Sequence, residues 1–258
     1  MSNTALITGA SSGLGAEFAR YHASKGGDVI ITARRSDALE ALKAELEAAH
    51  KITAHVIALD LGAAGGADAL YDAVKALGVQ VDVLINNAGF GGHGIHIERD
   101  LSDERAMIDL NIGALVTLTH RFASDMVNQG GGKILQVGST AGFAPGPNQA
   151  VYFATKAFVN SFSQAINQEL IAKGVTSTVL APGFVETGFA KAANLEGTAM
   201  VKGGGAQADT VARFGYDAMM KGELIVINDR MLRVLMNWVI PLLPRRMAIK
   251  MIAQSQSK

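Results

Sequence analysis

The chain has 258 residues, of which 49% are hydrophobic and 18% charged, so it is long enough for one large α/β domain and too apolar to be disordered. Lys and Arg together number 23, as do Asp and Glu, so no overall basic field attracts DNA or RNA; we expect a small-molecule substrate and no nucleic acid. The absence of cysteine excludes disulfides, thiolate metal sites and cysteine catalysis.

Short apolar runs rich in β-branched residues alternate with longer segments of helical periodicity. This alternation predicts an α/β fold, with residues 1–258 forming a single domain around a doubly wound parallel sheet with helices on both faces. The expected strands are Ala5–Thr8, Val29–Ala33, Ala54–Leu59, Val81–Asn86, Lys133–Gly138, Thr176–Ala181 and a weaker one at Leu224–Ile227. The expected helices are Leu14–Lys25, Asp37–His50, Gly66–Leu77, Ser102–Asn128, Val151–Lys173 and Ala206–Lys221.

A glycine-rich turn joins the first strand to the first helix. Gly9, Gly13 and Gly15 would let a dinucleotide pyrophosphate approach backbone N–H groups at a helix N-terminus, as in a Rossmann-type fold. The stretch Gly9–Gly13 also fits the G-x-S-x-G elbow of serine hydrolases. We reject that alternative because its serine follows the very first strand and the last histidine, His120, lies in mid-chain.

The second strand ends in two arginines, where an NAD-specific turn usually carries an acid for the ribose 2′-hydroxyl. Arg34 and Arg35 instead offer positive charge and paired hydrogen bonds to a 2′-phosphate. The alternative is a solvated charge pair that opens a helix. We therefore expect NADP(H) rather than NAD(H).

Four residues suggest a catalytic centre. Tyr152 and Lys156 are four apart on a helical segment, so the phenol and the ammonium share one face, where the ammonium would favour the phenolate. Ser139 follows a strand at the sheet edge where ligands bind, and Asn111 is a polar residue among apolar neighbours. A surface pair, a capping serine and a satisfied core asparagine are the structural alternatives.

With these residues in place, the sequence resembles the short-chain dehydrogenase/reductase family over nearly its whole length. The matching motifs are Thr8–Gly15, Asp60-Leu61, Asn86-Asn87-Ala88-Gly89, the tetrad Asn111, Ser139, Tyr152 and Lys156, and Pro182-Gly183 followed by Thr187. The resemblance implies hydride transfer between NADP(H) and a carbonyl or alcohol carbon, with reduction the expected direction in a cell. The last segment also resembles the DltE-like NADP-dependent branch of the family.

The resemblance assigns a role to each member of the tetrad. Tyr152 would exchange a proton with the carbonyl oxygen, Ser139 would polarise the carbonyl, and Lys156 would lower the tyrosine pKa and hold the nicotinamide ribose. Asn111 would support a water in the proton relay. The cofactor is expected to contact Gly9, Ser11, Ser12, Gly13, Leu14, Gly15, Arg34, Arg35, Asp60, Leu61, Asn87, Ala88, Gly89, Tyr152, Lys156, Pro182, Gly183, Val185 and Thr187.

Other segments carry weaker predictions. His93 and His96 lack a third metal ligand, so we expect no metal there and place them at the substrate mouth or in solvent. Residues 187–210 resemble an apolar substrate lid, which indicates an uncharged or hydrophobic substrate. The helical segment 228–258 is basic; we expect it to pack on the domain or a partner subunit, with a membrane surface as the alternative.

Two other functions fit parts of the pattern. A non-catalytic NADP-sensing regulator on the same fold would have no use for Tyr152 and Lys156, and a sugar-nucleotide epimerase would have a differently spaced glycine turn. We expect a homodimer or homotetramer formed through the helices at 102–128 and 151–173. No leader pattern precedes Ala5, and polar residues interrupt the apolar stretch 231–243, so we expect a soluble, cytoplasmic protein.

Overall fold

A parallel seven-stranded sheet forms the centre of the computed structural model, which describes residues 3–258. Its strand order is β3-β2-β1-β4-β5-β6-β9, and every adjacent pair is parallel. The order reverses beside β1, which is where open α/β sheets bind ligands. The strands are β1 (Thr4–Thr8), β2 (Asp28–Ala33), β3 (Ala54–Ala58), β4 (Val83–Asn86), β5 (Gly132–Val137), β6 (Val175–Leu180) and β9 (Ile225–Val226).

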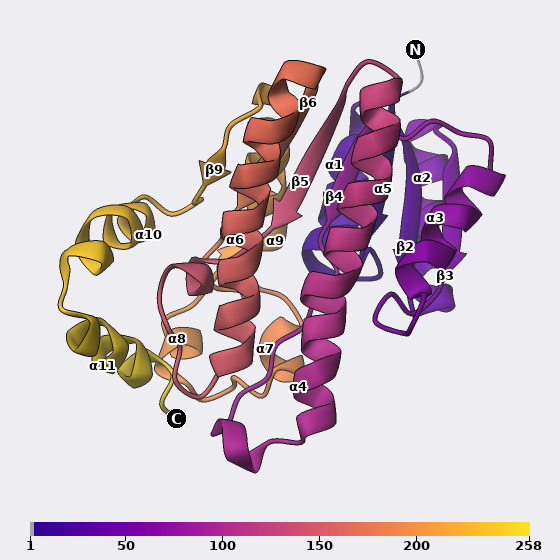
Figure 1. Ribbon diagram of the computed structural model, residues 1–258. Helices are drawn as coiled ribbons and strands as arrows, with labels where there is room; N and C mark the ends of the chain where they lie inside the picture. Colours follow the sequence, from indigo (N-terminus) through magenta and orange to yellow (C-terminus); the bar gives the residue numbers. More distant parts are fainter. Residues whose placement is uncertain (1–2) are drawn as a thin grey trace.

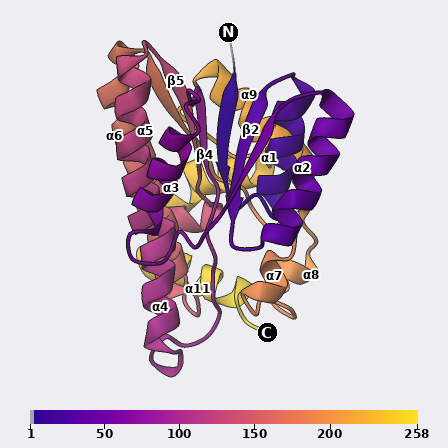
Figure 2. The ribbon, with the colours of Figure 1, turned by 90° about the vertical axis from the view of Figure 1, so that its right-hand side faces the viewer.

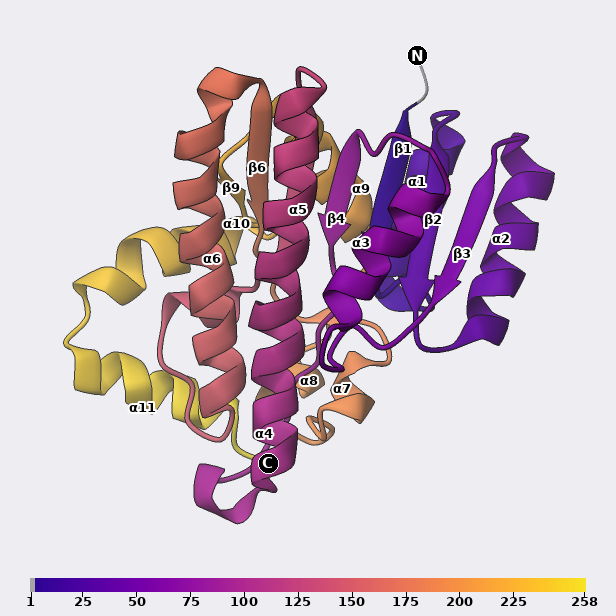
Figure 3. The ribbon, with the colours of Figure 1, turned by 45° about the vertical axis from the view of Figure 1, so that its right-hand side comes forward.

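Helices cover both faces of the sheet, as predicted (Figure 3). One face packs against α1 (Gly13–Ser24), α2 (Ser36–His50) and α9 (Ala208–Lys221). The other face lies under α3 (Gly66–Ala76), α5 (Leu115–Asn128) and α6 (Ala150–Leu170). In α5, Leu115, Leu118, Phe122 and Met126 recur every three or four residues, so their buried side chains form one stripe against the sheet.

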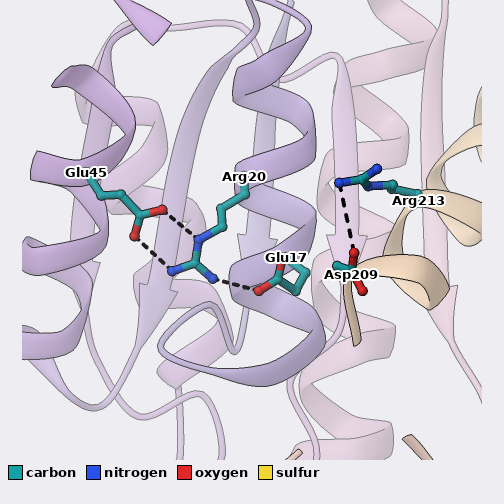
Figure 4. Close-up of polar contacts among 5 residues, drawn as sticks. All are labelled: Glu17, Arg20, Glu45, Asp209 and Arg213. Atoms are coloured by element: carbon teal, nitrogen blue, oxygen red, sulfur yellow. Dashed lines mark hydrogen bonds and ion pairs between the residues drawn. The ribbon is translucent and has the colours of Figure 1, made fainter. Parts of the chain in front are cut away.

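An arginine on the first helix ties it to the second. The Arg20 guanidinium lies 2.7 and 2.8 Å from the two carboxylate oxygens of Glu45 on α2, and 2.7 Å from Glu17 on its own helix (Figure 4). The hydrogen bond from Arg20 lowers the pKa of Glu45. Both side chains are largely exposed, so we expect this pair to contribute less than about 1 kcal/mol to the free energy of unfolding. A looser pair, Asp209 with Arg213, lies on α9.

The predicted helix at 102–128 is divided by a π-helical turn. α4 (Leu101–Ile108) leads into η2 (Asp109–Ala114), which continues as α5. π-Turns widen a helix locally and recur at functional sites. Asn111 lies inside this turn. Two strand bounds also differ from the prediction. β4 begins at Val83 rather than Val81, and β9 contains only Ile225 and Val226 of the predicted Leu224–Ile227.

Short elements follow the main sheet and lie across its carboxyl edge. They include α7 (Phe189–Ala192), α8 (Ala199–Lys202) and a two-stranded parallel ribbon of β7 (Val185–Glu186) and β8 (Ala206–Gln207). The expected lid, residues 187–210, therefore contains α7, α8 and β8. Figure 2 shows α7, α8 and α11 (Arg245–Ser255) together beneath the sheet, at the end opposite the N-terminus.

The C-terminal segment comprises α10 (Arg230–Val234), η5 (Leu235–Val239), η6 (Ile240–Leu242) and α11, and it runs around the outside of α6 (Figure 1). Met236 and Ile240 on its inner face pack against Val179, Ala181 and Ile227. No helix among residues 3–258 is both long and apolar enough to cross a membrane.

Candidate active site

A large cavity of about 820 Å³ lies at the carboxyl edge of the sheet. Its wall includes the glycine turn, the ends of β2, β4 and β5, the first turns of α6, the short elements at 187–200 and the C-terminal segment. Eighteen of the nineteen cofactor residues expected from the sequence line this cavity, and Gly15 alone does not.

The glycine turn has the backbone that the sequence predicts. Gly9 and Gly13 adopt φ of +68° and +57°, a left-handed region that favours glycine. A Cβ on Gly15 would lie 2.3 Å from the carbonyl oxygen of Gly9, so Gly15 allows α1 to pack against the turn and lies behind the cavity wall. The turn thus presents backbone and the start of α1 to the cavity, which suits a pyrophosphate.

The segment after β4 holds this turn in place. Asn87 donates its side-chain amide to the carbonyl oxygens of Thr8 and Gly9, at 2.9 and 3.3 Å. The Thr8 hydroxyl in turn accepts from the backbone N–H groups of Asn87 and Ala88, at 3.0 and 2.9 Å. The two motifs are therefore one hydrogen-bonded unit in the folded chain.

The two arginines after β2 are exposed and line the cavity. Arg35 donates to the hydroxyls of Ser11 and Ser12 at 3.1 and 3.0 Å, which ties its guanidinium to the glycine turn. Among residues 3–258, no carboxylate forms an ion pair with Arg34 or Arg35. Their positive charges are available to an anionic group in the cavity.

Tyr152 is half-buried on the first turn of α6, and its ring lies 5.5 Å from that of Phe189 on α7. Burial raises the pKa of Tyr152 to about 12, while the hydroxyl of Ser139 acts to lower it. Ser139 accepts a hydrogen bond from the backbone N–H of Ala141 at 3.1 Å, so it also caps a short turn. Its O–H donates to the Pro182 carbonyl oxygen at a long 3.5 Å, so a ligand in the cavity could compete for this weak hydrogen bond.

Lys156 is buried one turn further along α6. Its Nζ lies 5.9 Å from the centre of the Tyr152 ring and donates to the carbonyl oxygen of Val137 at 2.7 Å. Burial lowers the pKa of Lys156 to about 8. Within residues 3–258 no carboxylate pairs with this ammonium, which has three N–H donors, so a ligand with hydroxyl groups could accept from it.

Asn111 lies behind the wall rather than on it. Its amide donates to the Phe90 carbonyl at 2.9 Å and to the Thr155 hydroxyl at 3.1 Å, and its Oδ1 accepts from the Phe90 N–H at 3.1 Å. Asn111 therefore fastens the segment after β4 to α6. This places it in contact with both halves of the site without facing the cavity.

The two histidines singled out in the sequence do not line the cavity. His93 Nε2 lies 2.7 Å from the carbonyl oxygen of Gln256, and His96 lies 3.4 Å from Glu104 on α4. Their partners are separate, and residues 3–258 contain no cluster of three or more side chains suited to a metal ion.

Sequence reasoning missed several residues of the site. Asn160, one turn beyond Lys156, donates to the Ser139 carbonyl at 3.0 Å and so positions that serine. Spacing along α6 could have indicated it. The C-terminal segment contributes a further part of the wall that no local motif signals, namely Leu232, Leu235, Met236, Met251, Ile252, Ser255 and Gln256.

The glycine cradle, the free cations beside it and the Tyr152–Lys156 pair fit a nicotinamide dinucleotide, which defines the chain as a dinucleotide-binding protein of the doubly wound class. A family model described as short chain dehydrogenase matches residues 3–197. The protein belongs to this family of oxidoreductases, whose members bind NAD or NADP.

Its relatives include enzymes and a solved complex. The chain is 38% identical to a sulfoacetaldehyde reductase of Chromohalobacter salexigens over 227 residues, which cover 86% of this chain and 85% of the relative. It is 39% identical to a serine 3-dehydrogenase of Agrobacterium fabrum over 193 residues, covering 73% and 74%. A short-chain dehydrogenase from Sphingobium yanoikuyae, solved in complex with NADPH, is 30% identical, with a TM-score of 0.84 and 90% of each chain covered.

Proposed function

We propose that this protein is an NADP(H)-dependent carbonyl reductase. The observation that carries the proposal is that Tyr152, Ser139 and Lys156 line the same cavity as the glycine turn. Burial raises the pKa of Tyr152 to about 12, and a protonated phenol is the form that donates to a carbonyl oxygen during reduction. The sulfoacetaldehyde reductase among the relatives supports the same reaction class.

The cofactor, when bound, supplies the hydride for the carbonyl carbon. Ser139 would donate a hydrogen bond to the carbonyl oxygen and orient it, and Tyr152 would transfer its proton to that oxygen. Lys156, held by Val137, would place positive charge near the phenolate that forms. Ser139 follows β5 while Tyr152 and Lys156 lie on α6, and all three line one cavity.

Asn111 acts in this proposal by positioning the segment at Phe90 and the helix at Thr155. Its Oδ1 retains a second lone pair, which could hold the relay water implied by the family resemblance. The preference for NADP(H) rests on Arg34 and Arg35, and the relative solved with NADPH supports it. Assignment to the DltE-like branch remains a prediction from the last segment.

The lid and the C-terminal wall are part of the same proposal. Residues 187–210 would cover the nicotinamide and substrate, since Phe189, Leu195 and Met200 line the cavity. The segment 228–258 would complete the substrate chamber through its inner face. We also propose a homodimer or homotetramer formed through the helices at 102–128 and 151–173, where Ile108 and Phe158 are exposed; light scattering would test it.

The experiment is to mix the purified protein with NADPH and a panel of aldehydes and ketones and to follow the loss of NADPH absorbance. A reductase consumes NADPH only when a carbonyl compound is present. Binding of NADPH without consumption across the panel would favour the alternative, a non-catalytic NADP-sensing regulator.

A further inference from the structure

Charge divides the cavity into two ends. Its charged wall residues are Arg34, Arg35 and Asp60, near the glycine turn, and Lys156 at the catalytic centre. The part of the wall from Pro182 to Gln256 has no charged side chain. An anionic substrate placed there would lose its hydration with no counterion besides Lys156, which is costly.

Two buried glutamines lie next to each other at this uncharged end of the cavity. Gln149 caps α6 three residues before Tyr152, and Gln256 follows α11, yet the Gln149 amide lies 2.5 Å from the Gln256 side-chain oxygen. Both line the cavity, and they are only 3% and 2% exposed. His93 holds the Gln256 backbone carbonyl at 2.7 Å, which fixes the pair from the other side.

The side-chain oxygen of Gln149 has no hydrogen-bond partner among residues 3–258. A buried acceptor left unpaired is unfavourable, and a donor on a ligand would remove that cost. The same oxygen would disfavour a ligand that offers only an acceptor.

We propose that the substrate is an uncharged, mainly apolar carbonyl compound with one hydrogen-bond donor, a hydroxyl or amide N–H, that binds the Gln149 side-chain oxygen. This inference rests on the proposed reductase function. The carbonyl faces Tyr152 while the rest of the molecule lies against side chains such as Phe153, Leu232 and Met236. This substrate class would distinguish the chain from reductases that act on anionic aldehydes.

The test uses aldehydes of graded chain length that are unsubstituted or carry a terminal hydroxyl, methoxy or carboxylate group. At the best length, we expect kcat/KM for the hydroxy aldehyde to exceed that for the methoxy aldehyde about tenfold, and the carboxylate to be the poorest. Gln149→Leu should bring the hydroxy-to-methoxy ratio near one. Gln164→Leu, on the same helix but away from the cavity wall, should leave the ratio unchanged.

A wild-type preference for the carboxylate or methoxy aldehyde would overturn the inference and leave the reductase function standing. A hydroxy-to-methoxy ratio that survives Gln149→Leu would do the same. Failure to reduce any aldehyde or the corresponding methyl ketones, with NADPH bound, would count against the proposed function itself. Gln256→Leu gives a second variant in case Gln149→Leu does not fold, with Gln254→Leu as its exposed control.

Discussion

The guanidinium of Arg35 lies 3.0 Å from the hydroxyl of Ser12, so the end of β2 is hydrogen-bonded to the turn that begins α1. A hydroxyl does not neutralise the guanidinium, which keeps its charge for a ligand. Arg34, its neighbour, lines the cavity without such a tether. The pair therefore offers one positioned and one adaptable cation at the place where a ribose phosphate would lie.

Arg34→Asp should weaken NADPH binding at least tenfold, because it replaces an attraction to the 2′-phosphate with a repulsion. NADH binding should change less than about threefold, since NADH lacks that phosphate. Titration of each cofactor against the intrinsic protein fluorescence measures both constants. Arg105→Asp, an exposed arginine on α4, is the control. Tighter binding of NADH than NADPH by the wild type would show that the cofactor prediction is wrong.

Tyr152→Phe should lower kcat about a thousandfold, because general acid catalysis typically contributes 10² to 10⁴. NADPH binding should stay within about threefold, since the ring is kept. Single-turnover NADPH oxidation checks the first expectation and fluorescence titration the second. Tyr71→Phe is the matched control, since its hydroxyl bonds Asp125 outside the cavity. Unchanged turnover in Tyr152→Phe would remove the proposed acid.

Asn111→Leu should reduce the free energy of unfolding by roughly 3 kcal/mol, because it leaves the backbone groups of Phe90 without their partners. Thr155→Val removes only one of the three hydrogen bonds that the Asn111 side chain makes, and it should lower the free energy of unfolding by about 1 kcal/mol. Denaturant unfolding measures both. If the two variants lose equal stability, Asn111 does not fasten the Phe90 segment as the geometry indicates.

The rate of carbonyl reduction should fall as pH rises through about 8. Burial lowers the pKa of Lys156 to about 8, so the ammonium loses its proton there, while Tyr152, with a pKa of about 12, stays protonated. Profiles of kcat/KM against pH measure this limb. Lys156→Arg should move it to higher pH, because a guanidinium stays charged. Lys133→Arg, away from the cavity wall, should leave the limb in place.

We expect the free energy of unfolding to fall in acid because of the buried His22 side chain. Its ring lies 2.7 Å from the Tyr216 hydroxyl and 2.9 Å from the Asn3 carbonyl, and burial lowers its pKa below the ordinary value of 6.5. The unfolded chain then binds more protons below about pH 6.5, so the free energy of unfolding decreases as pH falls through that range. His22→Gln should flatten the dependence of Tm on pH, and exposed His50→Gln should not.

Local patterns predicted most of the sheet and its helices. The strands read as apolar runs because both faces of a parallel sheet are covered, and all seven were found near their expected positions. Bounds were less accurate at β4 and β9, where pairing with a neighbouring strand decides which residues are included. No local sequence pattern indicated the π-helical turn around Asn111. Its hydrogen bonds are to Phe90 and Thr155, which are distant in the sequence.

The candidate site likewise has parts that local sequence patterns predicted and parts that they did not. The glycine turn, the arginine pair and the Tyr152–Lys156 spacing were visible in the sequence because each lies within a few residues, where backbone geometry relates side chains directly. Burial dominates the pKa values of both Tyr152 and Lys156, and the expected effect of Lys156 on the Tyr152 pKa when the cofactor is bound stays a prediction.

The sequence by itself determined the dinucleotide cradle, the order of the strands along the chain and the catalytic candidates, because these depend on short-range spacing. Only the tertiary structure decided what closes the substrate end. Gln149 and Gln256 are 107 residues apart, and their contact depends on the path of the C-terminal segment around α6. Such a contact arises from packing many elements together, and no local pattern encodes it.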